Sequence, residues 1–365
     1  MTGARVLGVD SGGSGLRVAL ADAGADAGAD AGAPGRTASA RSREPVRTGP
    51  GGIDAGHLLE QLLGLARTLL DAEPGGGPVV AVAIGAAGMS TLGDRLRAEV
   101  PGALARALGV RRVALATDAV TAYAGALGQR PGAVVAGGTG MVALGTDLRG
   151  WRRADGWGHL LGDCGSGAWI GRAGLEAALR AHDGRTGGSR ALLAAAGAAL
   201  GPAGELPGRV YPRADRPAVL ASFAPEVGRC AAAGDAVAAG ILAQAARHIA
   251  EAAEAVCPAG AADPASGPAP EIALTGGLFR LGEPLLVPLR AELERRLPYA
   301  RTVPAAGDPL AGAVLLASAL ARDALLLPPH PTLLHVPGGE PTGDGDTGTG
   351  DGGTGGRRPD TAPDE

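Results

Sequence analysis

The chain carries VLGVDSGGSGLRVAL at residues 6–20, and a second stretch of the same pattern, AVVAGGTGMVALG, follows at residues 133–145. In each stretch an apolar run, a glycine-rich turn and another apolar run predict a β-hairpin. Each turn also carries a hydroxyl residue beside its glycines, Ser14 in the first and Thr139 in the second. Glycine lets the backbone approach a ligand closely and point several N–H groups at one place, which suits phosphate oxygens. The two hairpins therefore predict a duplicated fold that holds a nucleotide between two lobes.

The composition is that of a globular protein with few aromatic residues. Apolar residues make up 45% of the 365 residues, whereas aromatic residues make up only 2%. Ala, Val and Leu must therefore build the core, and the length is sufficient for two domains. Lysine and asparagine are absent. An arginine, a metal ion or an array of backbone N–H groups must therefore neutralise any bound phosphate.

Charge, hydropathy and cysteine content disfavour several classes of protein. A net charge of −4 is not typical of a nucleic-acid binder, which shows a basic face. No apolar run approaches the ~18 residues of a membrane span, and no signal peptide is recognisable because Asp10 interrupts the N-terminal apolar run. Three dispersed cysteines are too few for a disulfide framework or a zinc site. We therefore expect a reduced, cytoplasmic protein without membrane or nucleic-acid partners.

Strands and helices alternate along the chain, which predicts an α/β protein with mainly parallel sheets. Residues 22–36 predict a low-complexity loop, 151–169 a loop rich in Trp and Gly, and 337–365 a disordered tail. Residues 183–233 are harder to interpret and are expected to contain two helices. Hydrophobic spacing predicts helices over 55–72, 92–108, 118–127, 170–182, 235–256 and 308–321, and strands over 79–84, 112–116 and 271–274.

The order of the motifs resembles a known family. Between and after the hairpins come TDA at residues 117–119, the block GWGHLLGDCGSGAWIG at 156–171 and TGG at 275–277. This order is similar to that of the N-acetylglucosamine kinases and the related BadF/BadG/BcrA/BcrD-type ATPases, within the larger group of actin-like ATPases, sugar kinases and Hsp70 proteins. The resemblance covers residues 4–325, and the block at 156–171 is its most specific part.

The resemblance implies two actin-like, ribonuclease H-like lobes of duplicated βββαβαβα topology, with a cleft between them for ATP and a sugar. It implies an N-terminal lobe over residues 1–117 and a C-terminal lobe over 118–325. The terminal helix at 308–321 is expected to pack back on the first lobe. ATP and Mg²⁺ are the implied cofactors, an amino sugar is the implied substrate, and the family allows a homodimer.

The same resemblance implies a role for each motif residue. Asp118 would be the catalytic base, and Asp10 would help to hold the magnesium ion, usually through water. The residues implied in ATP phosphate binding are Gly12, Gly13, Ser14, Gly138, Thr139 and Gly140. Those implied in adenosine binding are Gly276 and Gly277, and those implied beside the sugar are Trp157, Gly158 and Asp163.

These implied roles agree with the chemistry of phosphoryl transfer, which needs alignment and charge neutralisation more than covalent help. A sugar hydroxyl is a poor nucleophile, so a carboxylate at about 2.6–3.2 Å can accept its proton as the new bond forms. Asp118 follows a predicted strand at its carboxyl end, where open α/β sheets bind ligands. The carboxylate of Asp163 can accept hydrogen bonds from two adjacent sugar hydroxyls.

Each acidic residue also has a structural interpretation. Asp10 could serve its own tight turn, Asp118 could cap the helix that follows it, and Asp163 could be a turn residue only. Trp169 and His159 are interpreted as structural rather than catalytic.

The chain departs from the family pattern at three places. Met141 stands where serine is common, Cys164 stands where glutamate is common, and residues 48–52 lack the asparagine often found near the sugar. The resemblance implies an ATP-dependent kinase acting on the 6-hydroxyl of an amino sugar, N-acetylglucosamine first, with glucosamine as the alternative substrate. An ATPase activator of a dehydratase and a non-catalytic sugar sensor are the alternatives from other classes.

Overall fold

The structure is a computed structural model that describes residues 3–13, 15–24, 37–49, 52–259 and 269–338. Three expectations fall wholly or largely outside these ranges. They are the phosphate contact of Ser14, the low-complexity loop at 22–36 and the disordered tail at 337–365.

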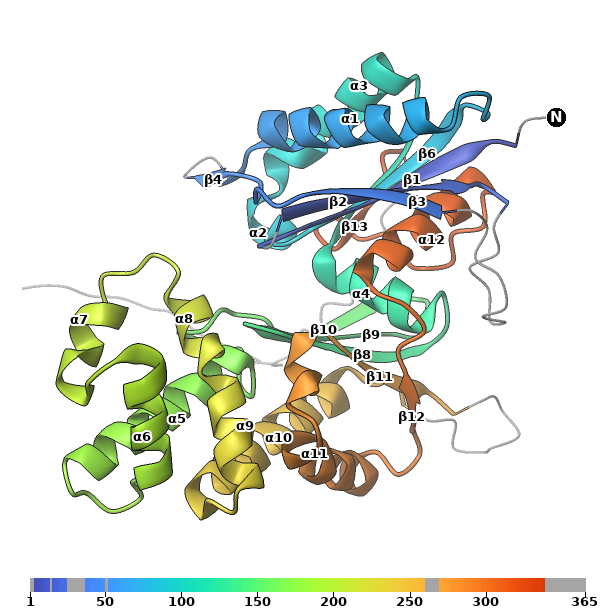
Figure 1. Cartoon of the computed structure of the whole chain (residues 1–365). Coiled ribbons are helices and arrows are strands. Elements are labelled where there is room, and N and C mark those ends of the chain that lie inside the picture. The colour runs from blue at the N-terminus through green and yellow to red at the C-terminus, as the bar shows by residue number, and fades with distance from the viewer. Residues whose placement is uncertain (1–2, 14, 25–36, 50–51, 260–268, 339–365) are drawn as a thin grey trace, which may run out of the picture.

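The first lobe is built on a six-stranded sheet with the strand order β13-β7-β6-β1-β2-β3 (Figure 1). β2 is antiparallel to β1 and β3, β6 and β7 run parallel to β1, and β13 is antiparallel to β7. The parallel strands are almost continuous apolar runs because helices cover both faces of this sheet. The bounds are β1 (Arg5–Gly12), β2 (Gly15–Asp22), β3 (Thr37–Ser42), β6 (Val79–Ala86), β7 (Arg112–Thr117) and β13 (Leu334–His335), with β4 (Thr48–Gly49) and β5 (Gly52–Ile53) as a separate hairpin.

The second lobe repeats this arrangement on a five-stranded sheet with the order β10-β9-β8-β11-β12. β8, β9 and β10 are antiparallel, and β11 and β12 run parallel to β8. The bounds are β8 (Gly132–Gly137), β9 (Met141–Thr146), β10 (Trp151–Asp155), β11 (Glu271–Thr275) and β12 (Arg301–Pro304). Both lobes therefore follow the order βββαβαβα, which confirms the predicted actin-like α/β fold.

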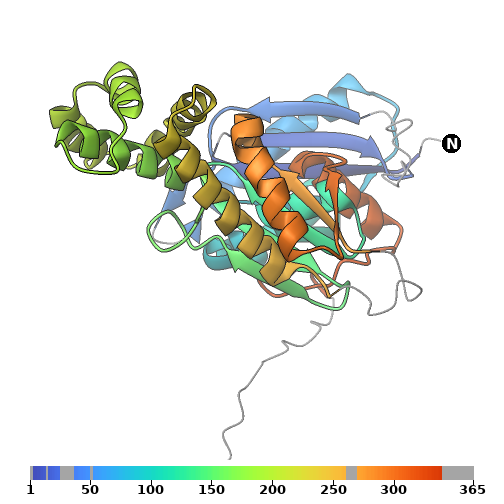
Figure 2. The ribbon, with the colours of Figure 1, turned by 90° about the horizontal axis from the view of Figure 1, so that it is seen from below.

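Helices cover the outer face of each sheet (Figures 1 and 2). On the first lobe these are α1 (Ala55–Ala72) and α3 (Asp94–Leu108), with the short α2 (Met89–Leu92) before α3. On the second lobe the long α10 (Ala236–Val256) packs on the sheet and on α11 (Glu283–Arg296). The remaining helices extend to one side of that lobe: α5 (Gly167–His182), α6 (Arg190–Leu200), α7 (Leu206–Val210), α8 (Arg216–Ser222) and α9 (Ala224–Ala232).

The helix α4 (Asp118–Leu127) lies between the two sheets. It contacts β1, β6 and β7 on one side and β8, β9 and β11 on the other. Every residue of α4 after Asp118 is buried, because protein surrounds this helix on all sides. The last long helix, α12 (Pro309–Ala321), packs beside α4 and against β1, β2, β6 and β7. The C-terminal segment thus returns to the first lobe, and the division at residue 118 remains our proposal for the domain boundary.

Glycine residues allow α4 and α12 to approach each other closely. A Cβ on Gly312 would overlap the carbonyl oxygen of Thr121, and one on Gly125 would overlap that of Asp308. Gly8 on β1 is equally restricted, since its Cβ would lie 2.5 Å from the backbone nitrogen of Val314. Close-packed interiors have no space for these extra atoms, so the glycines set the distance between the helices and the sheet.

Two expectations from the sequence are wrong in detail. The loop expected over 151–169 begins with strand β10, which is an edge strand with two arginines and no buried residue. Such a strand lacks the apolar alternation by which strands are recognised. The segment 183–233 contains four α-helices rather than two. They are short, and α7, α8 and α9 each begin with a proline in the first turn, which blurs the helical pattern.

No helix within the described ranges combines the length and the apolar character that crossing a bilayer requires.

Candidate nucleotide and sugar site

The first glycine turn joins β1 to β2, and Gly12 pairs with Gly15 at the end of that ladder. A Cβ built on Gly12 or Gly13 meets no atom within 4 Å. Among the described residues, the backbone at these two glycines is therefore open on one side, as a turn that receives a ligand on its backbone requires. Asp10 precedes the turn on β1 and lies directly opposite Arg17 of β2.

An ion-pair bridge holds the Asp10 side chain. Nη2 and Nε of Arg17 donate to Oδ2 of Asp10 at 2.8 and 3.0 Å. Nη1 of the same arginine donates to Oδ2 of Asp308 at 2.6 Å. Asp308 is also the N-cap of α12, where its Oδ1 accepts the N–H of Ala311 at 2.9 Å. The bridge therefore connects the first hairpin to α12, the helix that follows the last strand of the second lobe.

The second glycine turn is anchored to the start of α5. The N–H of Gly138 donates to the carbonyl oxygen of Gly140 at 2.8 Å across the turn. The carbonyl oxygens of Gly138 and Thr139 accept the N–H groups of Gly167 and Ala168 at 2.9 and 3.1 Å. These bonds satisfy N–H groups of the first turn of α5, which have no partner within the helix. A Cβ on Gly138 meets nothing within 4 Å, so this turn also has an open side.

The segment Thr275–Gly277 lies against the same turn. Gly276 has φ +100°, and a Cβ there would overlap the carbonyl oxygen of Gly137. A glycine is needed at this position for both reasons. The next residue, Gly277, faces open space. The structure thus brings the predicted adenosine motif next to the second predicted phosphate turn.

Asp118 begins α4 but does not cap it. Thr117 is the N-cap, and its Oγ1 accepts the N–H of Val120 at 3.3 Å. Oδ1 of Asp118 accepts the N–H of Ala119 at 2.9 Å. The residue is exposed to solvent, yet protein on most sides displaces water from it. This desolvation raises the pKa of the Asp118 carboxyl, the charge of Asp10 raises it further, and Arg153 opposes the shift.

The carboxylate of Asp163 is buried beside the second turn. The residue is 8% exposed and has φ +53°, a conformation that aspartate tolerates better than most residues. Its Oδ1 accepts the N–H of Gly158 at 3.1 Å, and its Oδ2 lies against Gly140. Burial raises the pKa of Asp163, and the nearby charge of Asp155 acts in the same direction. Asp163 and Gly158, both predicted to lie beside the sugar, are thus next to Gly140, which is predicted to bind phosphate.

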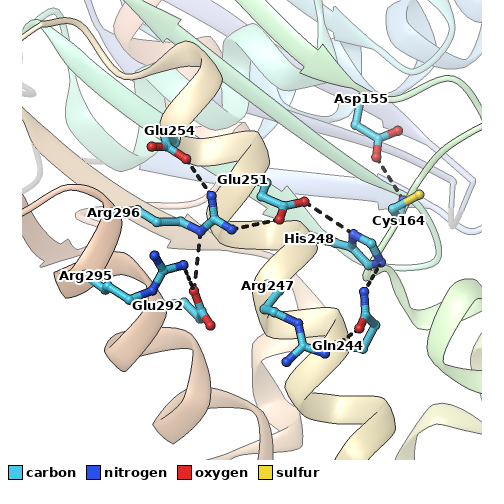
Figure 3. A network of polar contacts seen from close by, with 10 residues as sticks. All are labelled: Asp155, Cys164, Gln244, Arg247, His248, Glu251, Glu254, Glu292, Arg295 and Arg296. Atoms are coloured by element: carbon cyan, nitrogen blue, oxygen red, sulfur yellow. Dashed lines mark hydrogen bonds and ion pairs between the residues drawn. The ribbon is translucent and has the colours of Figure 1, made fainter.

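Asp155 organises this loop, although the sequence interpretation did not include it. Its Oδ1 accepts the N–H groups of Gly156 and Asp163 at 2.8 and 2.5 Å. Its Oδ2 accepts the N–H of Cys164 at 2.9 Å (Figure 3). One carboxylate thus ties both ends of the loop together. The Asp-Gly pair at 155–156 is a turn signal that could have pointed to it.

Trp157 lies on the surface, where it stacks on a cation. The residue is 67% exposed, and the guanidinium carbon of Arg153 lies 4.8 Å from the ring centroid. Arg153 also donates to the carbonyl oxygens of Asp155 and Gly156. The exposed indole is available to a ligand, whereas Trp169 is partly buried against the core of the second lobe.

A polar network behind the loop supports α10 and α11 (Figure 3). Arg296 of α11 forms ion pairs with Glu251 and Glu254 of α10. Glu251 also contacts His248, whose ring packs edge-on against Trp169 at a centroid distance of 5.2 Å. The interpretation of Trp169 as structural fits this position.

The open turns and the acidic residues are compatible with a magnesium nucleotide. Gly12, Gly13, Gly138 and Gly277 present backbone faces that no side chain of the described residues fills. Within the described part of the chain, no group of three or more His, Cys, Asp or Glu side chains could hold a metal ion by itself. Magnesium needs no such cage, because it commonly binds one or two carboxylates together with substrate phosphates and water. Asp10 would hold the ion, which would neutralise charge on the phosphates.

The duplicated βββαβαβα lobes and the paired glycine turns define the actin-like ATPase and sugar-kinase class of fold. Residues 7–317 match the model of the BadF/BadG/BcrA/BcrD ATPase family, and the chain belongs to this family. A curated relative, the N-acetylmuramic acid/N-acetylglucosamine kinase of Clostridium acetobutylicum, is 37% identical over 107 residues. That match spans 29% of this chain and only 34% of the relative.

Solved structures show the same fold over nearly their whole length. A protein of Chromobacterium violaceum assigned as an N-acetylglucosamine kinase is 26% identical and has a TM-score of 0.59, covering 87% of this chain and 99% of its own. A protein of Porphyromonas gingivalis with the same assignment is 17% identical, with a TM-score of 0.62 and the same coverage.

Proposed function

We propose that the protein is an ATP-dependent sugar kinase that transfers the γ-phosphate to the 6-hydroxyl of an amino sugar, with N-acetylglucosamine as the first candidate. The observation that carries this proposal is the environment of the Asp118 carboxyl. The residue is exposed to solvent, it is not the N-cap of α4, and the pKa of its carboxyl is raised where the two lobes meet. A base of this kind accepts a proton from a sugar hydroxyl more readily than an ordinary aspartate does.

The other residues supply alignment. The open turns at Gly12–Gly13 and Gly138–Gly140 would receive phosphates on their backbone N–H groups. Asp163 and the loop that Asp155 orders would position the sugar next to the second turn. Water is excluded from such a site when the lobes close, which limits wasteful hydrolysis.

The relatives support the choice of sugar. The curated relative from Clostridium acetobutylicum acts on N-acetylmuramic acid and N-acetylglucosamine by its name, and the Chromobacterium violaceum protein is assigned to N-acetylglucosamine. Glucosamine remains the alternative substrate, because the same carboxylate at Asp163 suits an ammonium group as well as hydroxyl groups.

The test measures ADP release from ATP and Mg²⁺ with N-acetylglucosamine, glucosamine, N-acetylmuramic acid, glucose and N-acetylmannosamine in turn. Asp118→Asn is compared with Asp71→Asn, which removes an exposed carboxylate from α1. We expect turnover with one amino sugar, a loss of about 10²–10⁴-fold in Asp118→Asn and none in Asp71→Asn. ³¹P NMR of the product identifies the phosphorylated hydroxyl.

A wild-type protein that releases no sugar-dependent ADP would overturn the proposal. Sugar binding without turnover would then identify a sensor. A brown, oxygen-sensitive protein would instead identify an activator ATPase.

A further inference from the structure

A cationic cavity lies beside the first glycine turn. Its volume is about 510 Å³, and we call it the arginine cavity. The residues that line it are Gly15, Arg17, Arg41, Ser42 and Arg43. Three of the five carry a positive charge in a protein that has no lysine.

The strand register places these cations together. Asp10 of β1 lies opposite Arg17 of β2, and Arg17 lies opposite Arg41 of β3. Residues directly opposite one another project to the same face of a sheet, so the three side chains form a row. That face is the one on which α12 packs, because Arg17 also reaches Asp308.

The end of β3 is held firmly against the glycine turn. Gly15 has φ +121°, and a Cβ there would overlap the carbonyl oxygen of Ser42 and lie 3.0 Å from Cα of Arg43. Gly15, which pairs with Gly12 across the turn, is also part of the cavity lining, so the cavity begins next to the turn. A ligand on the backbone of Gly12 and Gly13 would lie beside the cavity.

The charges in the cavity are only partly compensated. Arg17 has two carboxylate partners, Asp10 and Asp308. Arg41 and Arg43 are exposed and form no hydrogen bond or ion pair with any residue in the described part of the chain. Like charges directly opposite each other on a sheet repel, so an anion bound beside Arg41 would add to the compensation that Asp10 and Asp308 already give Arg17.

We propose that the arginine cavity binds the phosphate chain of the nucleotide. Arg41 and Arg43, which have no ion-pair partner among the described residues, would bind the phosphate oxygens, and Arg17 would link them to Asp10. A polyphosphate matches the cavity because each guanidinium presents a fork of donors to phosphate oxygens. The adenosine motif follows β11, which pairs with β8 in the second lobe, whereas the start of β2 and the end of β3 belong to the first lobe (Figure 1). A nucleotide bound to both lobes would therefore run from Gly277 towards these arginines. The inference rests on the proposed nucleotide-dependent function and extends it to residues outside the glycine turns.

The experiment compares Arg41→Gln/Arg43→Gln with Arg67→Gln/Arg111→Gln in the full-length protein. The control removes the same charge from exposed arginines elsewhere on the surface of the first lobe. Calorimetry measures the Kd for inorganic tripolyphosphate and for MgATP at two salt concentrations, and initial rates give KM for ATP and for the sugar.

We expect the cavity variant to raise the Kd for tripolyphosphate and the KM for ATP by about tenfold or more, because each lost bond is charge-assisted. The KM for the sugar should stay unchanged, and the control should bind both anions as the wild type does. Equal Kd values in the cavity variant and the wild type would overturn the inference, as would an equal loss in the control. These outcomes are separate from the kinase proposal, because tripolyphosphate binding is measured without any turnover.

Discussion

Oδ2 of Asp163 lies 2.5 Å from the position that a Cβ on Gly140 would occupy. The loop proposed to hold the sugar therefore touches the turn proposed to hold the phosphates. We expect Gly140→Ala to displace the Asp163 carboxylate and to raise KM for both ATP and the sugar about tenfold or more, since displacement by about 1 Å can cost 10²-fold in rate.

The control is Gly150→Ala, because a Cβ on Gly150 meets no atom within 4 Å. It should leave both KM values unchanged. Initial-rate kinetics with each substrate varied in turn provide the measurement. An effect of Gly140→Ala on ATP alone would show that the contact does not couple the two substrates.

Asp155 is expected to position the sugar loop without contacting the nucleotide. Asp155→Ala leaves the N–H groups of Gly156, Asp163 and Cys164 without their acceptor, so it should raise the sugar KM about tenfold. Asp155→Asn keeps one acceptor oxygen and should have the smaller effect. Asp147→Ala, which removes the acceptor of a comparable turn before β10, serves as control. A parallel loss of ATP binding, measured by calorimetry, would contradict a role confined to the sugar loop.

The pKa of Asp118 predicts a pH dependence. The base must be ionised, and desolvation and Asp10 raise its pKa, so kcat/KM should fall with decreasing pH already above the usual aspartate value of about 3.9. Arg153 lowers this pKa. Arg153→Gln should therefore move the acid limb of the profile to higher pH. A limb that stays in place or moves to lower pH would refute the electrostatic role of Arg153.

The same pKa predicts an effect on stability. A carboxyl whose pKa is raised on folding favours the unfolded state at every pH at which it is ionised when folded. Asp118→Asn should therefore raise the melting temperature at pH 8 while removing activity, and the gain should disappear at acid pH. Scanning fluorimetry over a pH series measures this, and a lower melting temperature at pH 8 would contradict it.

The close contact between α4 and α12 predicts that a single methyl group added there lowers the stability of the protein. Gly312→Ala would force a Cβ onto the carbonyl oxygen of Thr121, so we expect a loss of about 1–3 kcal/mol or more in the free energy of unfolding. Gly240→Ala on the exposed side of α10 meets no atom and should instead stabilise the protein by about 0.5–1 kcal/mol. Urea denaturation followed by circular dichroism compares the two. A Gly312→Ala protein as stable as the wild type would show that the two helices can separate at no cost.

Cys164 is expected to react slowly despite its place beside the site. Partial burial raises the pKa of its thiol, and the charge of Asp155 acts in the same direction. Because the thiolate is the reacting form, alkylation by iodoacetamide should be slow at pH 7 and should accelerate as the pH rises towards 9 and beyond. Peptide mass spectrometry measures the labelling of Cys164, and bound sugar should slow it. Full activity after complete labelling of Cys164 would show that the thiol is not near the sugar.

The sequence predicted most long elements well because their local patterns are strong. The helix predicted over 55–72 is α1, and the one predicted over 118–127 is α4. Edge strands and the short helices over 183–233 were missed or miscounted, because exposed strands and proline-started turns carry no clear hydrophobic period. The polar roles of Asp155 and Arg153 were missed for a different reason: their partners are backbone groups that only the folded loop brings near.

What the amino-acid order determined is the set of local structures: two hairpins with glycine turns, an aspartate after a buried strand and a glycine-rich block. Glycines, apolar runs and capping residues act on neighbours a few positions away, so the local structures that they form can be recognised from the sequence alone. Only the tertiary structure decided which of these local structures contact one another. Arg17 joins Asp308 across 291 residues of sequence, and it can do so because α12 returns to the first lobe. That return depends on glycine contacts with α4 and β1, which no local pattern reveals.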